Sequence, residues 1–201
     1  GMWGLLAAMT RMHGVLLIGA AAAELVEHLG RFDWKAIARR LPALILPAVG
    51  TLVYLALNWS VTGNPFAFTV MQQHWSQGFC PIADTLWYVL QNALSYPTEL
   101  VRYQIWVPTI LLFPVFFALL VWARNKFRSM YTLYGFVYLV LNYSLSWLLS
   151  AGRYLSCALP SFLFAAALTR GRPRLTAVLA AAMGAGFLLN LVWFLNGGQV
   201  M

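Results

Sequence analysis

Charged side chains are scarce in this 201-residue chain: only 9% of its residues are Asp, Glu, Lys or Arg, and only five are acidic. A soluble domain carries about 25% charged residues, so the chain lacks the polar surface that a water-soluble fold needs. Hydrophobic residues make up 62% of it instead. Apolar runs close to 20 residues long recur along the sequence, and a helix of that length crosses the hydrocarbon core of a bilayer. The composition predicts a single all-α transmembrane domain over residues 1–201.

The sequence has only two cysteines, and its first 30 residues do not resemble a signal peptide. Residues 1–30 hold no basic leader, and their apolar pattern runs into a helix, so we expect no removable signal peptide. Two cysteines, Cys80 and Cys157, are too few for a disulfide framework. We interpret them as small apolar residues. A bridge between them stays open, because the topology predicted below places both on one side of the membrane.

Six transmembrane helices are predicted from the apolar runs. They cover about residues 11–29, 41–59, 105–123, 129–149, 152–169 and 175–195. An alternative first helix over residues 2–22 would place Arg11 near mid-membrane, where a charge is costly. Residues 60–104 are polar and aromatic, and this segment alone is long enough to fold outside the bilayer as an outer region.

Lysine and arginine residues gather in alternate connectors. Ten of the thirteen lie at residues 31–40, 124–128 and 170–174, whereas the intervening segments hold only Arg102 and Arg153. The positive-inside rule then places the basic connectors in the cytoplasm and the outer region with Arg153 on the opposite side. This orientation explains the net charge of +8, so we expect a lipid bilayer as partner and no nucleic acid.

Ionisable side chains gather on the predicted outer side. They are Arg11, His13, His74, Asp84, Glu99, Arg102 and Arg153. A cationic rim above an apolar cleft suits a lipid phosphate, because the headgroup needs arginine donors and the tail needs the membrane. The alternative is that Arg11 and Arg153 extend to the interface without binding a ligand.

Polar and aromatic side chains crowd together at residues 72–75 of the outer region. Gln73, His74 and Trp75 suit the hydroxyls and ring faces of a sugar, although Trp also belongs in any interfacial aromatic belt. Asp84 lies near the start of an amphipathic outer helix, and we interpret it as a helix cap.

No metal site or cofactor is evident, and nothing in the sequence supports a divalent metal. Glu24, Glu27 and His28 share a helical face, but they lie at the predicted cytoplasmic end and we interpret them as a solvated helix terminus. His13 and His74 are an equally weak pair of ligands.

Three short motifs occur in order along nearly the whole chain. They are Thr10-Arg11-Met12-His13-Gly14-Val15-Leu16, then Thr62-Gly63-Asn64-Pro65 with Gln72-Gln73-His74-Trp75, and finally Arg153-Tyr154 with Pro160. Together they resemble PIG-V-type mannosyltransferases, which belong to the GT-C group of membrane glycosyltransferases. The resemblance implies a GT-C-like bundle that transfers a sugar, typically mannose, from a polyprenyl-phosphate donor to a lipid or glycan acceptor. It also implies action at the outer or lumenal face of a bacterial plasma membrane or an endoplasmic reticulum membrane.

The same resemblance assigns roles to seven residues. It implies that Arg11, Arg153 and Tyr154 hold the donor phosphate, whereas His13, Gln73, His74 and Trp75 border the sugar or the acceptor. One departure is serious: the family's catalytic acid lies in the first outer loop, and no acidic outer loop precedes Thr10. We therefore expect the catalytic base upstream of Gly1, and we expect this portion to be inactive by itself.

Two other classes of membrane protein compete with this prediction. A transporter usually carries ionisable groups near mid-membrane and internal repeats, and the sequence shows neither. A noncatalytic membrane subunit that binds a lipid or an enzyme partner stays open, because the chain lacks the catalytic loop.

Overall fold

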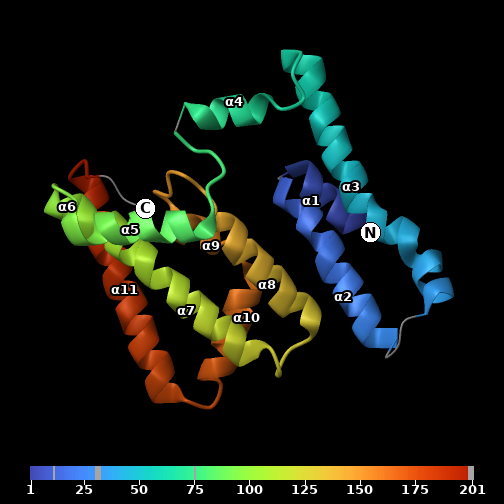
Figure 1. Cartoon of the computed structure of the whole chain (residues 1–201). Coiled ribbons are helices and arrows are strands. Elements are labelled where there is room, and N and C mark those ends of the chain that lie inside the picture. Colours follow the sequence, from blue (N-terminus) through green and yellow to red (C-terminus); the bar gives the residue numbers. More distant parts are fainter. Residues whose placement is uncertain (11, 30–32, 75, 199–201) are drawn as a thin grey trace. The chain divides into compact units, whose positions relative to one another are not determined.

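The protein is described here by a computed structural model of residues 1–10, 12–29, 33–74 and 76–198 (Figure 1). These residues are about 80% helical and form no β-strand, so the all-α prediction is confirmed for them. The chain divides into two compact units. Unit 1 comprises Gly1–Gly78 with Trp122–Tyr138, and unit 2 comprises Phe79–Val121 with Leu139–Met201.

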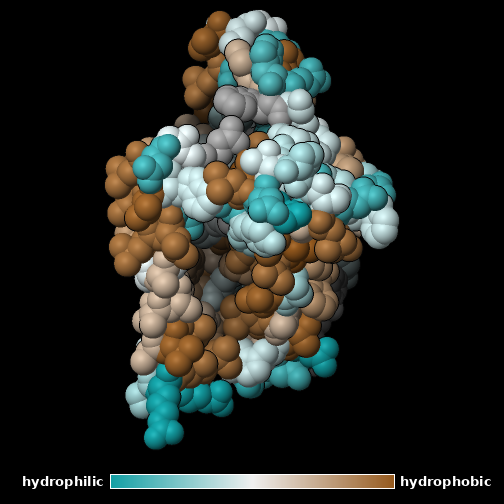
Figure 2. Space-filling view, turned by 90° about the vertical axis from the view of Figure 1, so that its left-hand side faces the viewer, coloured by the Kyte–Doolittle hydropathy of each residue, from teal (hydrophilic) through white to brown (hydrophobic). Residues whose placement is uncertain are grey.

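Three helices of the described chain are long and apolar enough to cross a membrane. They are α3 (Trp34–Thr62), the continuous helical segment Glu99–Ala123, and α11 (Pro173–Leu195). Most of their residues are not buried within the protein, and α11 buries none, which fits an apolar surrounding. On the face shown in Figure 2, hydrophobic side chains cover the flank and hydrophilic ones lie at the lower end, where α10 connects to α11.

The remaining predicted spans are shorter than expected. Residues 11–29 contain the 3₁₀ helix η1 (Met12–Leu16) and α2 (Leu17–Leu29), and residues 129–149 contain α8 (Ser129–Asn142). Residues 152–169 divide into α9 (Ala151–Leu155) and α10 (Leu159–Thr169), which begins with a proline in its first turn. A helix of 13 residues is only about 20 Å long, less than the roughly 30 Å of a hydrocarbon core.

In unit 1, α3 begins seven residues before the predicted second span. Asp33 is its N-cap, and the Oδ1 atom accepts hydrogen bonds from the backbone N–H groups of Lys35 at 2.9 Å and Ala36 at 3.3 Å. Because of this cap, residues 34–40 of the predicted basic connector belong to the helix. The helix ends at Gly63, whose φ of 71° favours glycine and whose N–H donates to the Trp59 carbonyl. A short helix, α4 (Ala67–Gln73), follows.

Helix α1 (Met2–Thr10) packs closely on α3 because glycine removes the side chain between them. A Cβ atom at Gly50 of α3 would lie 2.3 Å from the Leu5 carbonyl oxygen of α1. A Cβ atom at Gly14 would lie 2.4 Å from the Ala8 backbone. A side chain at Gly50 or Gly14 would therefore prevent the close contact of α1 with α3 and with η1.

Two acidic residues of α2 bind the start of α8. The prediction of a solvated helix terminus did not include these contacts, although Glu27 and His28 are exposed as it expects. Glu24 forms an ion pair of 2.8 Å with Arg128. Glu27 Oε2 accepts a hydrogen bond of 2.8 Å from the backbone N–H of Ser129, the first residue of α8. A carboxylate at a helix N-terminus satisfies an otherwise unpaired N–H group and interacts favourably with the helix dipole.

We expect Glu27→Gln to lower the melting temperature at neutral pH. The hydrogen bond from the Ser129 backbone holds the pKa of the Glu27 carboxyl below its usual value of 4.5. Glu27 lies outside the three long apolar helices. Because the folded-state pKa is lowered, the stabilisation is complete above the unfolded-state pKa and is lost as pH falls through the folded-state value. Thermal unfolding at pH 7 and pH 3 checks this, since the difference between wild type and variant should shrink at pH 3.

Glu99→Gln is the matched control for that experiment. Glu99 is 81% exposed and lies 3.5 Å from Arg102, so its removal should leave the melting temperature nearly unchanged. Equal effects of the two variants at pH 7 would contradict a capping role for Glu27.

Unit 2 is organised around α5 (Ile82–Ser95), which crosses the start of α7 (Val107–Ala123) (Figure 1). The segments α6 (Glu99–Val101) and η2 (Arg102–Trp106), a π-helical turn, join the two helices. Trp106 is fully buried, with the ring centroids of Tyr88 and Trp147 at 5.7 and 5.5 Å. Asp84 lies in the first turn of α5, but Pro81 is the N-cap residue, so the prediction of Asp84 as a cap is wrong.

The irregular segment between α8 and α9 is hydrogen-bonded to α5 and the residues before it. Cys80 N–H donates to the Ser144 carbonyl and the Thr85 hydroxyl donates to the Leu145 carbonyl, both at 3.0 Å. The Leu148 N–H donates to the Tyr88 hydroxyl oxygen. These bonds satisfy backbone polar groups of Ser144, Leu145 and Leu148. In the predicted helix over residues 129–149, the same groups would have bonded within the helix.

Tyr88→Phe should cost about 1–3 kcal/mol, because it leaves the buried Leu148 N–H without its acceptor. Burial raises the pKa of the Tyr88 phenol to about 12, so the neutral phenol is the folded form. The stabilisation is therefore complete below the unfolded-state pKa, near 10, and is lost as pH rises through about 12. Chemical unfolding at pH 8 measures the loss, and Tyr103→Phe, at an exposed ring, should cost less than about 0.5 kcal/mol.

Cys80 and Cys157 are present as thiols, with no bond between them. Both lie in unit 2.

Candidate functional site

The predicted sugar-binding residues lie in unit 1. His13 is exposed in η1, and its ring centroid lies 5.8 Å from that of Tyr138. Gln73 ends α4 and His74 follows it, both exposed. His74 Nδ1 lies 3.1 Å from the Val70 carbonyl oxygen, so the tautomer protonated at Nδ1 donates a hydrogen bond there. That tautomer leaves Nε2 as an acceptor for a hydroxyl group.

Two of the predicted residues, Arg11 and Trp75, lie outside the described residues. Arg153 and Tyr154 lie in unit 2, on the five-residue helix α9. The structure therefore brings Arg153 and Tyr154 together, whereas the convergence of Arg11 with Arg153 stays a prediction. His13 and the α4 residues belong to unit 1, and their approach to Arg153 likewise stays a prediction.

Arg153 is an exposed cation of unit 2. Its guanidinium carbon lies 5.5 Å from the Tyr154 ring centroid, and no described carboxylate pairs with it. A guanidinium without an acidic partner keeps its five N–H donors available for a phosphate. The aromatic ring beside it adds a cation–π contact that restrains the side chain.

An apolar groove of about 430 Å³ lies in the same unit. Its lining residues are Ala83, Leu86, Trp87 and Leu90 of α5 with Ile110, Phe113 and Pro114 of α7. The spacing of three, one and three residues puts the α5 members on one helical face. The residues of α5 that bind the irregular segment, Thr85 and Tyr88, lie on the other side of the helix. The groove and the segment that leads into α9 therefore contact opposite sides of α5.

Arg102, which the sequence places on the same outer rim, is already engaged. Its guanidinium donates to the Leu94 carbonyl at 3.5 Å and to the Tyr103 hydroxyl at 3.3 Å, and it pairs with Glu99 at 3.5 Å. Only 19% of its side chain is exposed. The Arg102 guanidinium thus binds a carbonyl in the last turn of α5. The Arg153 guanidinium, in contrast, has no described carboxylate partner.

Four of the five carboxylates bind neighbouring parts of the fold. Glu24 pairs with Arg128, Glu27 caps α8, Asp33 caps α3 and Glu99 pairs with Arg102. Asp84 is exposed in the first turn of α5. A general base must lie within hydrogen-bond reach of the proton that it removes, and these four are occupied elsewhere.

Comparison of the chain with models of protein families, with curated proteins and with solved structures finds no significant match. The resemblance to PIG-V-type mannosyltransferases therefore rests on the three motifs alone. Sequence reasoning missed the groove, although a signal was present. Residues 83, 86, 87 and 90 follow the spacing of a helical face, and residues 110, 113 and 114 do so on the next helix.

Proposed function

We propose that the protein is a multi-pass membrane protein and a GT-C-like glycosyltransferase portion that binds a polyprenyl-phosphate sugar. The isoprenoid chain lies in the apolar groove between α5 and α7, and the Arg153 guanidinium binds the phosphate. The acceptor is a lipid or a glycan on the extracytoplasmic or lumenal face, in a bacterial plasma membrane or an endoplasmic reticulum membrane.

One observation carries this proposal: a guanidinium that no described carboxylate pairs with and an apolar groove occur in the same unit. Arg153 lacks a described carboxylate partner, and the groove exposes Trp87 and Leu90. A polyprenyl phosphate needs both features, because its tail is apolar over its whole length and its headgroup is an anion. Charge-assisted hydrogen bonds from arginine match phosphate geometry.

The reaction would be a direct transfer of the sugar. The acceptor hydroxyl oxygen attacks the anomeric carbon, the bond from that carbon to the phosphate oxygen breaks, and the lipid phosphate leaves with the electron pair. A base takes the hydroxyl proton, and Arg153 stabilises the negative charge of the departing phosphate. His13, Gln73, His74 and Trp75 would border the sugar and the acceptor, and Arg11 and Tyr154 would assist with the phosphate.

A noncatalytic subunit that binds the same lipid is the second candidate. This candidate is favoured because four of the five carboxylates form caps and ion pairs. Those four are therefore not available as the general base of a transferase. Sugar transfer distinguishes the two candidates: the purified full-length protein should release polyprenyl phosphate from polyprenyl-phosphate mannose only if it is an enzyme.

Photo-crosslinking tests the lipid site that the two candidates share. A polyprenyl phosphate with a diazirine in its isoprenoid chain should label peptides that contain Leu86, Trp87 or Phe113. Excess unlabelled polyprenyl phosphate should remove this labelling. Labelling confined to α11, which also exposes large hydrophobic side chains, would show nonspecific contact and would contradict the proposal.

A further inference from the structure

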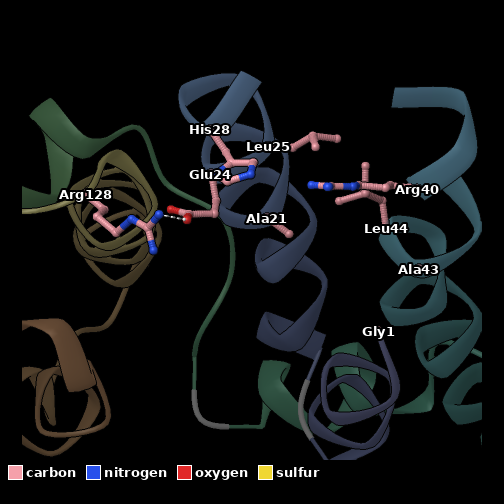
Figure 3. A pocket seen from close by; sticks show the side chains of 9 residues that line it. All are labelled: Gly1, Ala21, Glu24, Leu25, His28, Arg40, Ala43, Leu44 and Arg128. Carbon is pink, nitrogen blue, oxygen red and sulfur yellow. Dashed lines mark ion pairs between the residues drawn. The ribbon is translucent and has the colours of Figure 1, made fainter. Parts of the chain in front are cut away.

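Unit 1 contains a second pocket, which the proposed function does not use. It has a volume of about 460 Å³ and lies between α2 and α3, with the start of α8 beside it (Figure 3). Its lining divides into two kinds. Ala21, Leu25, Ala43 and Leu44 form the apolar wall, and Glu24, His28, Arg40 and Arg128 are the polar members; Gly1 also lines the pocket.

The charges of this pocket do not cancel. Arg128 is neutralised by Glu24 at 2.8 Å, which leaves Arg40 without a described carboxylate partner. Figure 3 shows the Arg40 side chain extending from α3 towards α2, where His28 and Leu25 lie. The pocket therefore presents an uncompensated guanidinium and an imidazole above an apolar wall, an arrangement that favours an anion with an apolar body.

We propose that this pocket binds the phosphate headgroup of an anionic phospholipid. Arg40 donates charge-assisted hydrogen bonds to the phosphate oxygens, and His28 contributes a further ring N–H donor. The first part of one acyl chain lies against Leu25, Ala43 and Leu44. A free phosphate would leave that apolar wall exposed, so the wall favours the lipid over the soluble ion.

The position of the pocket in the chain supports this ligand. Arg40 belongs to the basic first turns of α3, which also contain Lys35 and Arg39. The predicted orientation places this end in the cytoplasm, where the leaflet is rich in anionic lipids. Basic pockets between membrane helices on that side bind lipid headgroups in other proteins.

Arg39 provides a matched control for Arg40. It precedes Arg40 in the same helix and is also exposed, but it does not line the pocket. Arg39→Gln and Arg40→Gln therefore remove the same charge from the same turn. Only Arg40→Gln removes a donor from the pocket.

The test measures binding of fluorescent phosphatidylglycerol to the full-length protein in neutral detergent micelles by anisotropy. We expect Arg40→Gln to weaken binding about tenfold, the loss of one charge-assisted pair, and Arg39→Gln to leave it unchanged. Arg40→Lys should recover part of the affinity. A melting temperature equal to that of wild type confirms that the Arg40 variants are folded.

Three results would overturn the proposal. Equal weakening by Arg39→Gln and Arg40→Gln would indicate diffuse charge attraction. Displacement of the lipid by an equal concentration of inorganic phosphate would indicate a site for the free ion. Equal affinity for phosphatidylglycerol and phosphatidylcholine would show that the headgroup charge is not recognised. The crosslinking of polyprenyl phosphate in unit 2 is independent of this site and should be unaffected by Arg40→Gln.

Discussion

Arg153→Gln is expected to weaken the binding of polyprenyl phosphate by about tenfold to a hundredfold, the value of one or two charge-assisted hydrogen bonds. The cause is local, because the guanidinium has no described carboxylate partner whose loss could disturb the fold. Arg153→Lys keeps the charge but loses the planar donor arrangement, so it should bind with intermediate affinity. Equilibrium binding of a labelled polyprenyl phosphate to purified protein measures all three affinities.

Arg102→Gln is the control for this prediction. Arg102 belongs to the same predicted outer rim, but its guanidinium is directed to Leu94, Glu99 and Tyr103. Its replacement should leave the affinity for polyprenyl phosphate unchanged. Equal losses for Arg102→Gln and Arg153→Gln would show that general positive charge, and not a site at α9, attracts the lipid.

Gly50→Ala should destabilise unit 1 by about 3 kcal/mol, at the upper end of the usual cost of overpacking. The new Cβ atom would lie 2.3 Å from the Leu5 carbonyl oxygen and 3.0 Å from its carbon, and both belong to the backbone of α1. A flexible side chain could move away, but this contact requires α1 and α3 to separate. Denaturant unfolding in detergent micelles measures the free energy.

Gly19→Ala tests whether that loss reflects packing. Nothing lies within 4 Å of a Cβ atom at Gly19 in α2, so this variant should be neutral or should gain up to about 1 kcal/mol from helix propensity. If Gly50→Ala and Gly19→Ala unfold at the same denaturant concentration, the close approach of α1 and α3 does not contribute to stability.

Hydropathy predicted the three long helices well, because lipid exposure imposes one strong requirement on their composition. It predicted α11 to within two residues at its start. It failed over residues 143–149, which do not continue the helix α8. Tyr143 and Leu148 are buried there in an irregular segment. There the Tyr143 hydroxyl donates to the Thr109 carbonyl at 2.6 Å, a contact 34 residues away that no local pattern contains.

The sequence predicted only part of the candidate site, because the rest depends on contacts between distant parts of the chain. The charge pattern indicated Arg153 and Arg102 equally. Only the structure distinguishes the Arg153 guanidinium, which has no described carboxylate partner, from the Arg102 guanidinium, which donates to the last turn of α5. The apolar groove needs two helices, so the pattern of α5 alone could not reveal it.

The affinity difference between polyprenyl phosphate and the polyprenol of equal chain length tests the central claim most directly. If Arg153 binds the phosphate of a lipid whose chain lies in the α5–α7 groove, the polyprenyl phosphate should bind at least about tenfold more tightly than the polyprenol. That preference should disappear in Arg153→Gln. Equal binding of the two lipids by the wild-type protein would contradict a phosphate site in this unit.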